Sequence, residues 1–324
     1  MSLASRLGAT FALASLFGCG TTERDPADES TPSVAALQQQ LNLNPFDLRP
    51  LSKEPVPQPF VIEPIEPVVG TIINQAAAVR LGKAFFWDIQ AGSDGQVACA
   101  ACHQSFGADA RRFNTINPGS DGIFASGGVT GPGQTFTPSL ITNDDIVGAQ
   151  GVVRRQFVAF NPDPHIANED CTPITTTVFG TERQVEFRQA PMIYGAVFMR
   201  QLFWAGEASN EFNGSTIWGL NANNTQPTFT HWGNSALASQ AVGPPSNSVE
   251  MRCLGRPLVG PLGFAGKMLA RPPLQFQRVS PTDSVLGRLA NPNGPGLICN
   301  GAPCTYAGMI AEAFDQTTVD HMVD

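Results

Sequence analysis

The sequence is poor in positive charge, in charge of either sign and in long apolar runs. Lysine and arginine number 19 against 27 acidic residues, a formal net charge of −8, so no basic surface for nucleic acid is indicated. The marked apolar run at residues 7–17 is too short to span a bilayer as a mature helix. Only 14% of residues are charged, whereas 32 glycines and 27 prolines make about 18% of the chain (59 of 324). That composition is typical of a loop-rich globular protein.

The first residues have the pattern of a secretory signal rather than of a fold. Arg6 provides a small positive region, and the apolar run at 7–17 follows it. The run ends at Cys19 in a lipobox-like sequence, so we expect residues 1–19 to be a signal peptide with lipidation at Cys19. Gly20 favours the outer membrane of a Gram-negative bacterium, with the protein anchored there as a lipoprotein and facing the periplasm. The alternative is an ordinary secretory signal in which Cys19 has no role.

The rest of the chain divides by composition. Residues 20–70 are first acidic and then rich in proline, which predicts an extended tether. We expect the folded domain at 71–324. Its first element is an amphipathic helix that starts near Asn74 and ends near Asp88. A turn at 92–95 follows the helix.

The next motif, CAACH at 99–103, is the attachment signature of c-type haem. Cys99 and Cys102 are spaced to bond the two vinyl groups of one porphyrin, and His103 would then present a ring nitrogen to the iron. On one helical turn these three residues fall on the same side. The alternative is a zinc knuckle, which needs a second cysteine or histidine pair. The sequence therefore predicts one covalent haem c with His103 as axial ligand.

Four cysteines remain after Cys19 and the haem motif, and in an exported protein an even remainder favours disulfides. Cys299 and Cys304 flank a tight turn at 300–301, so their pairing is geometrically easy. Cys171 with Cys253 is the pair left by elimination. The alternatives are free thiols, or zinc at the C-terminal pair.

Several blocks of sequence, in the same order, resemble the first haem domain of the bacterial di-haem cytochrome c peroxidase family. They cover about residues 75 to 255, and a later segment at 306–314 continues the likeness. The blocks are LGKAFFWD at 81–88, SDG at 93–95, the haem motif at 99–103, RQAPM at 188–192, LFWAG at 202–206, QAVGPP at 240–245 and NSVEM at 247–251.

The chain also departs from the family. Family members carry two haem motifs and this chain has one, because no cysteine pair precedes the other histidines, His165, His231 and His321. Ala205 stands where the family has aspartate, and Ser248 where it has proline. We interpret 256–324 as the start of the connection to a second haem domain that this chain lacks.

The resemblance implies roles for residues around the haem. Glu250 and Gln240 would lie over its distal face, where a carboxyl group moves protons and an amide orients peroxide. Trp204 would be the aromatic bridge to a second haem, which here would have to come from another chain. His165, in a polar loop, is a candidate distal ligand. The alternatives are a solvated loop glutamate, a surface glutamine, a core tryptophan and a surface histidine.

These inferences combine into one expectation of fold and function. The fold is a mainly α, cytochrome c-like haem domain with long loops and little strand. The resemblance implies an enzyme that reduces hydrogen peroxide with electrons from a small donor protein, a cytochrome c or a cupredoxin. The alternatives are a single-haem electron-transfer lipoprotein, or the truncated, non-functional half of a di-haem enzyme.

Overall fold

The computed structural model describes most of the chain beyond the tether. The described residues are 55–62, 69–104, 107, 109–124, 132–135, 144–175, 178–220, 228 and 230–322. The chain separates into two units, Met1–Pro55 and Val56–Asp324, and the helices and strands described here belong to the second. The signal peptide, the lipidation at Cys19 and the acidic part of the tether lie outside the described residues. Within the described part, no helix has the length and apolarity to cross a membrane.

The helices are short, apart from α2. The described helices are α2 (Gln75–Trp87), α3 (Cys99–His103), α4 (Ala236–Ala241), α5 (Gly243–Ser246), α6 (Phe264–Leu269), α7 (Tyr306–Ala313) and α8 (Gln316–Asp320), with 3₁₀ turns η2 (Ile89–Ala91), η4 (Ala196–Phe198) and η5 (Gly287–Leu289).

The strands form separate antiparallel pairs rather than one sheet. The pairs are β1 (Phe60–Val61) with β8 (Trp232–Gly233), β2 (Ile116–Asn117) with β3 (Ile146–Val147), β4 (Gln150–Val153) with β7 (Arg183–Val185), β5 (Arg155–Ala159) with β6 (Asp170–Pro173) and β9 (Ile298–Cys299) with β10 (Ala302–Pro303).

The expectation of a mainly α fold is wrong. Helix makes up 24% of the structure and strand 17%. The segment 146–185, which holds the longer strands, is rich in β-branched residues, and these favour a pleated, half-buried surface. Frequent glycine and proline elsewhere keep the helices short, because both residues interrupt helical hydrogen bonding or its backbone geometry.

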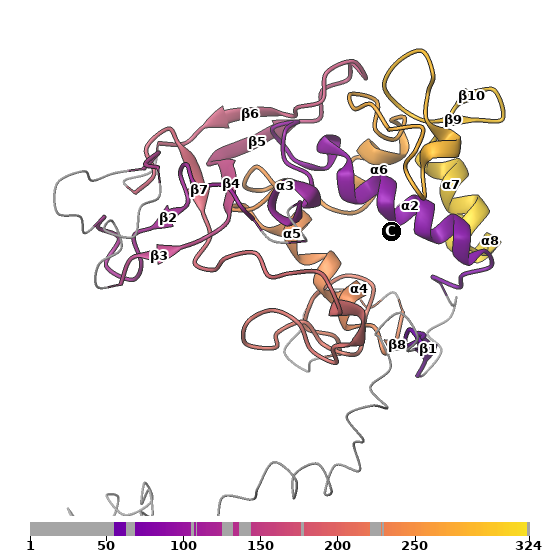
Figure 1. Ribbon diagram of the computed structural model, residues 1–324, viewed down its shortest axis with the longest axis horizontal. Helices are drawn as coiled ribbons and strands as arrows, with labels where there is room; N and C mark the ends of the chain where they lie inside the picture. The colour runs from indigo at the N-terminus through magenta and orange to yellow at the C-terminus, as the bar shows by residue number, and fades with distance from the viewer. Residues whose placement is uncertain are drawn as a thin grey trace, which may run out of the picture. The chain divides into compact units, whose positions relative to one another are not determined.

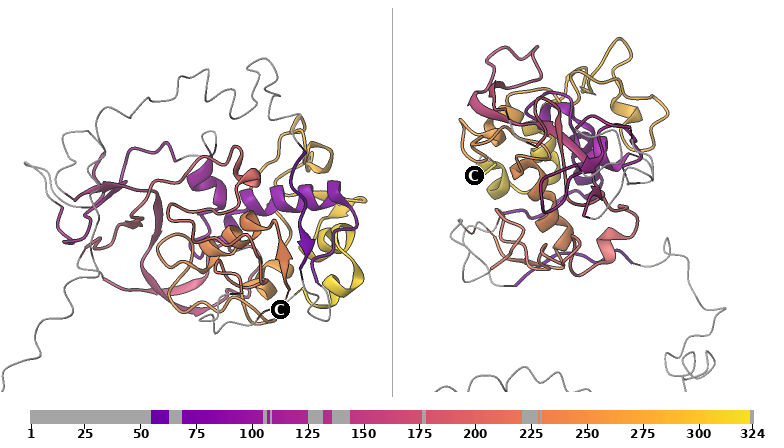
Figure 2. Two further views of the ribbon diagram at one scale, coloured as in Figure 1. Left: turned by 90° about the horizontal axis from the view of Figure 1, so that it is seen from below. Right: turned by 90° about the vertical axis from the view of Figure 1, so that its left-hand side faces the viewer.

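The helix expected between Asn74 and Asp88 is confirmed as α2. The Asn74 side chain caps its start by accepting a hydrogen bond from Ala77 N at 3.1 Å. At the other end, Asp88 accepts from Gln90 N at 2.9 Å and so caps the following turn η2. The helix packs against α7, and the two lie next to each other in Figure 1 and in the left-hand view of Figure 2. Its buried alanines, Ala77 and Ala84, allow this close packing.

The tether differs in part from its expectation. Phe60–Val61 forms strand β1 and pairs with β8, so the proline-rich segment contacts the domain at this point. Trp232 Nε1 also donates to the carbonyl of Val69 at 3.0 Å. Backbone pairing and an indole hydrogen bond therefore hold the end of the tether against the segment 230–233.

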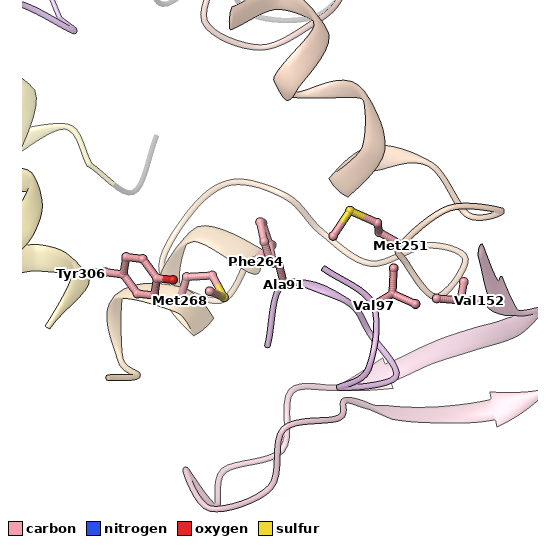
Figure 3. Packing of buried hydrophobic residues seen from close by; sticks show 7 residues of the cluster. All are labelled: Ala91, Val97, Val152, Met251, Phe264, Met268 and Tyr306. Carbon is pink, nitrogen blue, oxygen red and sulfur yellow. The ribbon is translucent and has the colours of Figure 1, made fainter. Parts of the chain in front are cut away.

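One hydrophobic cluster runs through the middle of the folded unit (Figure 3). Its side chains come from η2, the loop before α3, β4, the turn after α5, α6 and α7. Figure 3 shows Met251 beside Val97 and Val152 at one end, and Tyr306 beside Met268 at the other. The members are Ala91, Val97, Val152, Met251, Phe264, Met268 and Tyr306. Since α3 begins two residues after Val97, this cluster sets its position.

A fully buried ion cluster lies next to this hydrophobic cluster. Glu169 accepts from Arg256 Nη1 and from Lys267 Nζ, each at 2.8 Å, and Ser93 Oγ also bonds it. Burial by itself would raise the pKa of Glu169, but the charges of Lys267 and Arg256 lower that pKa overall. The carboxylate therefore stays ionised, and it ties the loop before α3 to α6.

Both cysteine pairs that were expected to form disulfides are bonded. Cys171–Cys253 joins β6 to the segment after α5, and Cys299–Cys304 closes the β9–β10 hairpin. The alternatives for these four residues, free thiols or zinc bound at Cys299 and Cys304, are therefore wrong.

Candidate haem-attachment site

Helix α3 places its three chemical groups on one turn. Among the described cysteines, Cys99 and Cys102 are the two that form no disulfide, and both are partly exposed. Burial raises the pKa of Cys99 to about 11 and that of Cys102 to about 12, so both sulfurs keep their protons at neutral pH. The site thus offers two neutral thiols side by side.

The ring of His103 is held in one tautomer. Its Nδ1 lies 2.7 Å from the carbonyl oxygen of Gly107 and 3.0 Å from that of Pro191. A carbonyl oxygen only accepts, so Nδ1 carries the hydrogen and Nε2 keeps its lone pair for a metal. Pro191 belongs to the RQAPM block, which gives that block a physical role at this site.

Gly107 is required for this contact. Its φ is +90°, and a Cβ there would lie 2.4 Å from Cγ1 of Ile193 and 2.5 Å from Ile193 N. Neither the backbone conformation nor the space accommodates a side chain. The segment that carries Pro191 therefore packs directly on Gly107, and both carbonyl groups reach the same ring nitrogen.

Arg111 fixes the other side of α3. Its guanidinium donates to Cys102 Sγ at 3.4 Å and to the carbonyl of Gln150 at 2.8 Å, and it pairs with Asp109 at 2.6 Å. These contacts tie the helix to the start of β4. Arg111, Asp109 and Gln150 carry no motif that would have singled them out in the sequence.

Glu250 lies close enough to both thiols to act on them electrostatically. Its charge contributes to the raised pKa of Cys99 and of Cys102. Burial, and after it the charge of Glu186, raise the pKa of Glu250 to about 8. A carboxyl group with that pKa is mostly protonated at neutral pH and is suited to act as a general acid.

Two further residues complete the surroundings of Glu250. Asn247 Nδ2 donates to Glu186 Oε1 at 3.0 Å, and its Oδ1 accepts from the backbone N–H of Glu250 at 3.4 Å. Burial raises the pKa of Glu186 as well. Asn247 lies in the NSVEM block, whereas nothing in the sequence pointed to Glu186, because no motif includes it.

The structure places the other expected site residues differently. Gln240 lies on α4, partly exposed, and forms no side-chain hydrogen bond to Glu250 within the described residues. Trp204 is 64% exposed; Nε1 donates to Gln189 O at 3.3 Å, and the Arg188 guanidinium lies 5.9 Å from its ring centre. This exposure rules out the core alternative for Trp204. His165 is exposed and lies 3.5 Å from Gln275, and none of its hydrogen bonds reaches α3.

These residues fit a covalently attached haem better than a metal ion. A haem needs two free thiols, an imidazole lone pair and apolar contacts, and the segment after Glu186, which includes Pro191, presents large apolar side chains to solvent. They are Phe187, Met192, Ile193, Tyr194 and Met199.

The zinc alternative for α3 has no support in the described part of the chain. There, the ligand atoms gathered closely enough for a metal ion belong to Glu169, Cys171 and Cys253. The sulfurs of Cys171 and Cys253 are bonded to each other. The Glu169 carboxylate forms ion pairs with Arg256 and Lys267.

Comparison with known proteins adds nothing to this geometry. The chain matches no protein-family model, and no curated protein and no solved structure shows significant similarity to it.

Proposed function

We propose that this chain carries one haem c, bonded through Cys99 and Cys102 with His103 as axial ligand, and that it is a peroxidase-type oxidoreductase. Its substrate would be hydrogen peroxide and its electron donor a small cytochrome c or cupredoxin. The observation that carries the proposal is the geometry of one helical turn: two unbonded thiols, an imidazole with Nε2 free, and a carboxyl group beside them that keeps its proton.

The residues have distinct tasks in this proposal. The haem supplies one-electron chemistry and a binding position for a substrate oxygen. The carbonyl groups of Gly107 and Pro191 hold His103 Nδ1–H, which would leave the Nε2 lone pair available to the haem iron and make it a stronger donor. Glu250 holds a proton at its carboxyl group, gives it to the leaving oxygen of the substrate and recovers a proton from water.

The first test asks whether the haem is attached. The full chain, exported in a bacterium that matures c-type cytochromes, should gain the mass of one haem that survives denaturation. Cys102→Ala should lose most of this covalent haem, whereas Cys304→Ala, which breaks a hairpin disulfide, should keep it. A wild-type protein that leaves the same host without covalent haem would contradict the proposal.

The second test asks what the haem protein does. Hydrogen peroxide should oxidise a reduced donor cytochrome in the presence of the wild-type protein. Glu250→Gln should lower the rate by about 10²- to 10⁴-fold, the usual contribution of a general acid. Glu182→Gln, an exposed acid in the strand segment that precedes Glu186, is the matched control and should leave the rate unchanged. Electron exchange with the donor but indifference to peroxide would favour the electron-carrier alternative instead.

The export features expected from the sequence belong to the same proposal. Covalent haem attachment takes place outside the cytoplasm, and both disulfides suit an oxidising compartment. We therefore infer a periplasmic protein that a lipid on Cys19 anchors to the outer membrane. A second haem-bearing chain is a further candidate partner, through the exposed Trp204.

A further inference from the structure

Glu186 and Glu250 are two acidic residues that share one side-chain amide. Asn247 Nδ2 donates to Glu186 Oε1 at 3.0 Å. Its own oxygen accepts from the backbone N–H of Val249 at 2.8 Å and from that of Glu250 at 3.4 Å. The amide therefore connects the Glu186 carboxyl group to the backbone of Glu250, and the charge of Glu186 acts on the Glu250 carboxyl group.

Two glycines, Gly148 just before β4 and Gly151 within it, let the backbones of Glu186 and Glu250 approach the same short segment. A Cβ at Gly148 would lie 1.8 Å from the carbonyl oxygen of Glu186. A Cβ at Gly151 would lie 1.8 Å from the carbonyl oxygen of Val249 and 2.9 Å from Cα of Glu250. The backbones of residues 186 and 249–250 thus press on opposite ends of one short segment, and only glycine permits both contacts.

Within the described part of the chain, no lysine, arginine or histidine forms an ion pair with either acid. The titratable groups that interact with Glu250 are Glu186 and the thiols of Cys99 and Cys102. Two neighbouring carboxyl groups without a cation do not both ionise at neutral pH, because the second charge would be repelled by the first in a poorly solvated place.

We propose that Glu186 and Glu250 form a carboxylic acid–carboxylate pair that stores one proton beside α3, with Asn247 as its spacer. Glu186 is then a positioning residue, which acts on the reaction only through Glu250. When Glu250 gives its proton to a substrate oxygen, both carboxyl groups are ionised, and water returns one proton to the pair. Only this delivery rests on the proposed function.

The test is an infrared pH titration of the full haem-loaded chain, which detects the carbonyl absorption of protonated carboxyl groups. The wild-type protein should keep such an absorption at neutral pH, and Glu250→Gln should remove it. Glu186→Gln should move its midpoint to lower pH by about one unit or more, because the repelling charge is gone. Glu182→Gln should leave the midpoint unchanged. Glu186→Asp keeps a carboxylate at this position, so its midpoint should lie close to the wild-type value.

Three results would overturn the pair. They are an unchanged midpoint in a folded Glu186→Gln protein, a wild-type protein without the absorption at neutral pH, and an absorption that survives Glu250→Gln. If Glu186→Gln does not fold, Glu186→Asp takes its place. Its midpoint should lie at the wild-type value or below it, and a midpoint above the wild-type value would also overturn the pair. The outcome is separate from the function, because a protein that titrates as a pair yet ignores peroxide refutes only the proposed function. A peroxidase whose Glu250 ignores Glu186 refutes only the pair.

Discussion

Gly107 shows how one residue without a side chain supports the chemistry of another. Its carbonyl group bonds His103 at 2.7 Å, and it reaches that position only with a φ of +90°. The sequence indicated His103 through its cysteine pair but had no signal for the glycine four residues later. The imidazole tautomer, on which metal binding depends, is therefore decided by backbone carbonyl groups.

Replacement of Gly107 by alanine should weaken this arrangement. We expect a loss of roughly 1–3 kcal/mol in the free energy of unfolding, because the new Cβ strains the backbone and meets Ile193. Chemical denaturation of the haem-loaded protein measures this loss. Gly180→Ala, at a positive φ but with open space around it, is the control for the backbone term alone. An equal loss in the two variants would show that the Ile193 contact is unimportant.

Glu250 also predicts how activity depends on pH. Its pKa is about 8, with burial as the main cause, so the acid form is lost as pH rises through that value. The rate of peroxide reduction should therefore fall above about pH 8, and Glu186→Gln should move this fall to lower pH. A rate profile measured from pH 5 to 10 tests the prediction. A profile that is flat across this range would mean that Glu250 delivers no proton.

Strand β4 is the element on which the candidate site depends most. It pairs with β7, carries Gly151 under the Glu250 turn, and contacts Arg111 through Gln150. The Val152 N–H also donates to Val249 O at 2.9 Å, which holds the turn against the strand. The sequence predicts little strand in this domain and gives no role to this segment.

Gly151→Ala should therefore be severe. The added Cβ would meet a backbone carbonyl oxygen at 1.8 Å, so the Glu250 turn must move away from the strand. We expect a loss of about 2–4 kcal/mol in stability, measured by denaturant unfolding, together with a lower pKa for Glu250 as it becomes solvated. The control is Gly82→Ala on the exposed face of α2, where nothing lies within 4 Å of the new Cβ. That variant should gain roughly 0.5–1 kcal/mol, because alanine is the better helix former.

In the folded unit as a whole, buried charge couples distant segments. Glu169, Arg256 and Lys267 come from three parts of the chain and meet with almost no exposed surface. Glu169→Gln leaves two cations without their partner and should cost about 3–5 kcal/mol in the free energy of unfolding. Glu312→Gln, which breaks a surface pair with Arg80, should cost less than about 1 kcal/mol. Similar losses in the two variants would contradict this view of the buried cluster.

The stability of the whole molecule should also depend on the Glu250 proton. Because folding raises the pKa of Glu250 from 4.5 to about 8, the folded state binds this proton more tightly than the unfolded state. The resulting stabilisation is complete below pH 4.5 and disappears as pH rises through 8. We expect a decline of about 2 kcal/mol over this window after solvent screening, and a flatter profile in Glu250→Gln. Unfolding free energies measured at several pH values test both expectations.

Local features of this protein could be predicted from the sequence. The helix from 75 to 87 follows from its apolar spacing and the Asn74 cap, and the turn that carries the two thiols and His103 follows from a five-residue motif. The Cys299–Cys304 bond needs only a tight turn between its ends. In each case the interacting residues are close in the chain, so their spacing alone limits how they can meet.

The strand pairs, the buried ion cluster and the electrostatic interaction between Glu186 and Glu250 are different. Glu186 and Glu250 lie 64 residues apart (250 − 186), and they come together because Gly148, just before β4, and Gly151, within it, pack against the backbones of residues 186 and 249–250. Likewise, the tautomer of His103 depends on the carbonyl group of Pro191. Trp204 is exposed because the rest of the folded chain leaves its side chain uncovered. Such contacts are long-range, and burial gives them their strength, so only the folded arrangement determines which groups are charged, neutral or able to bind a ligand.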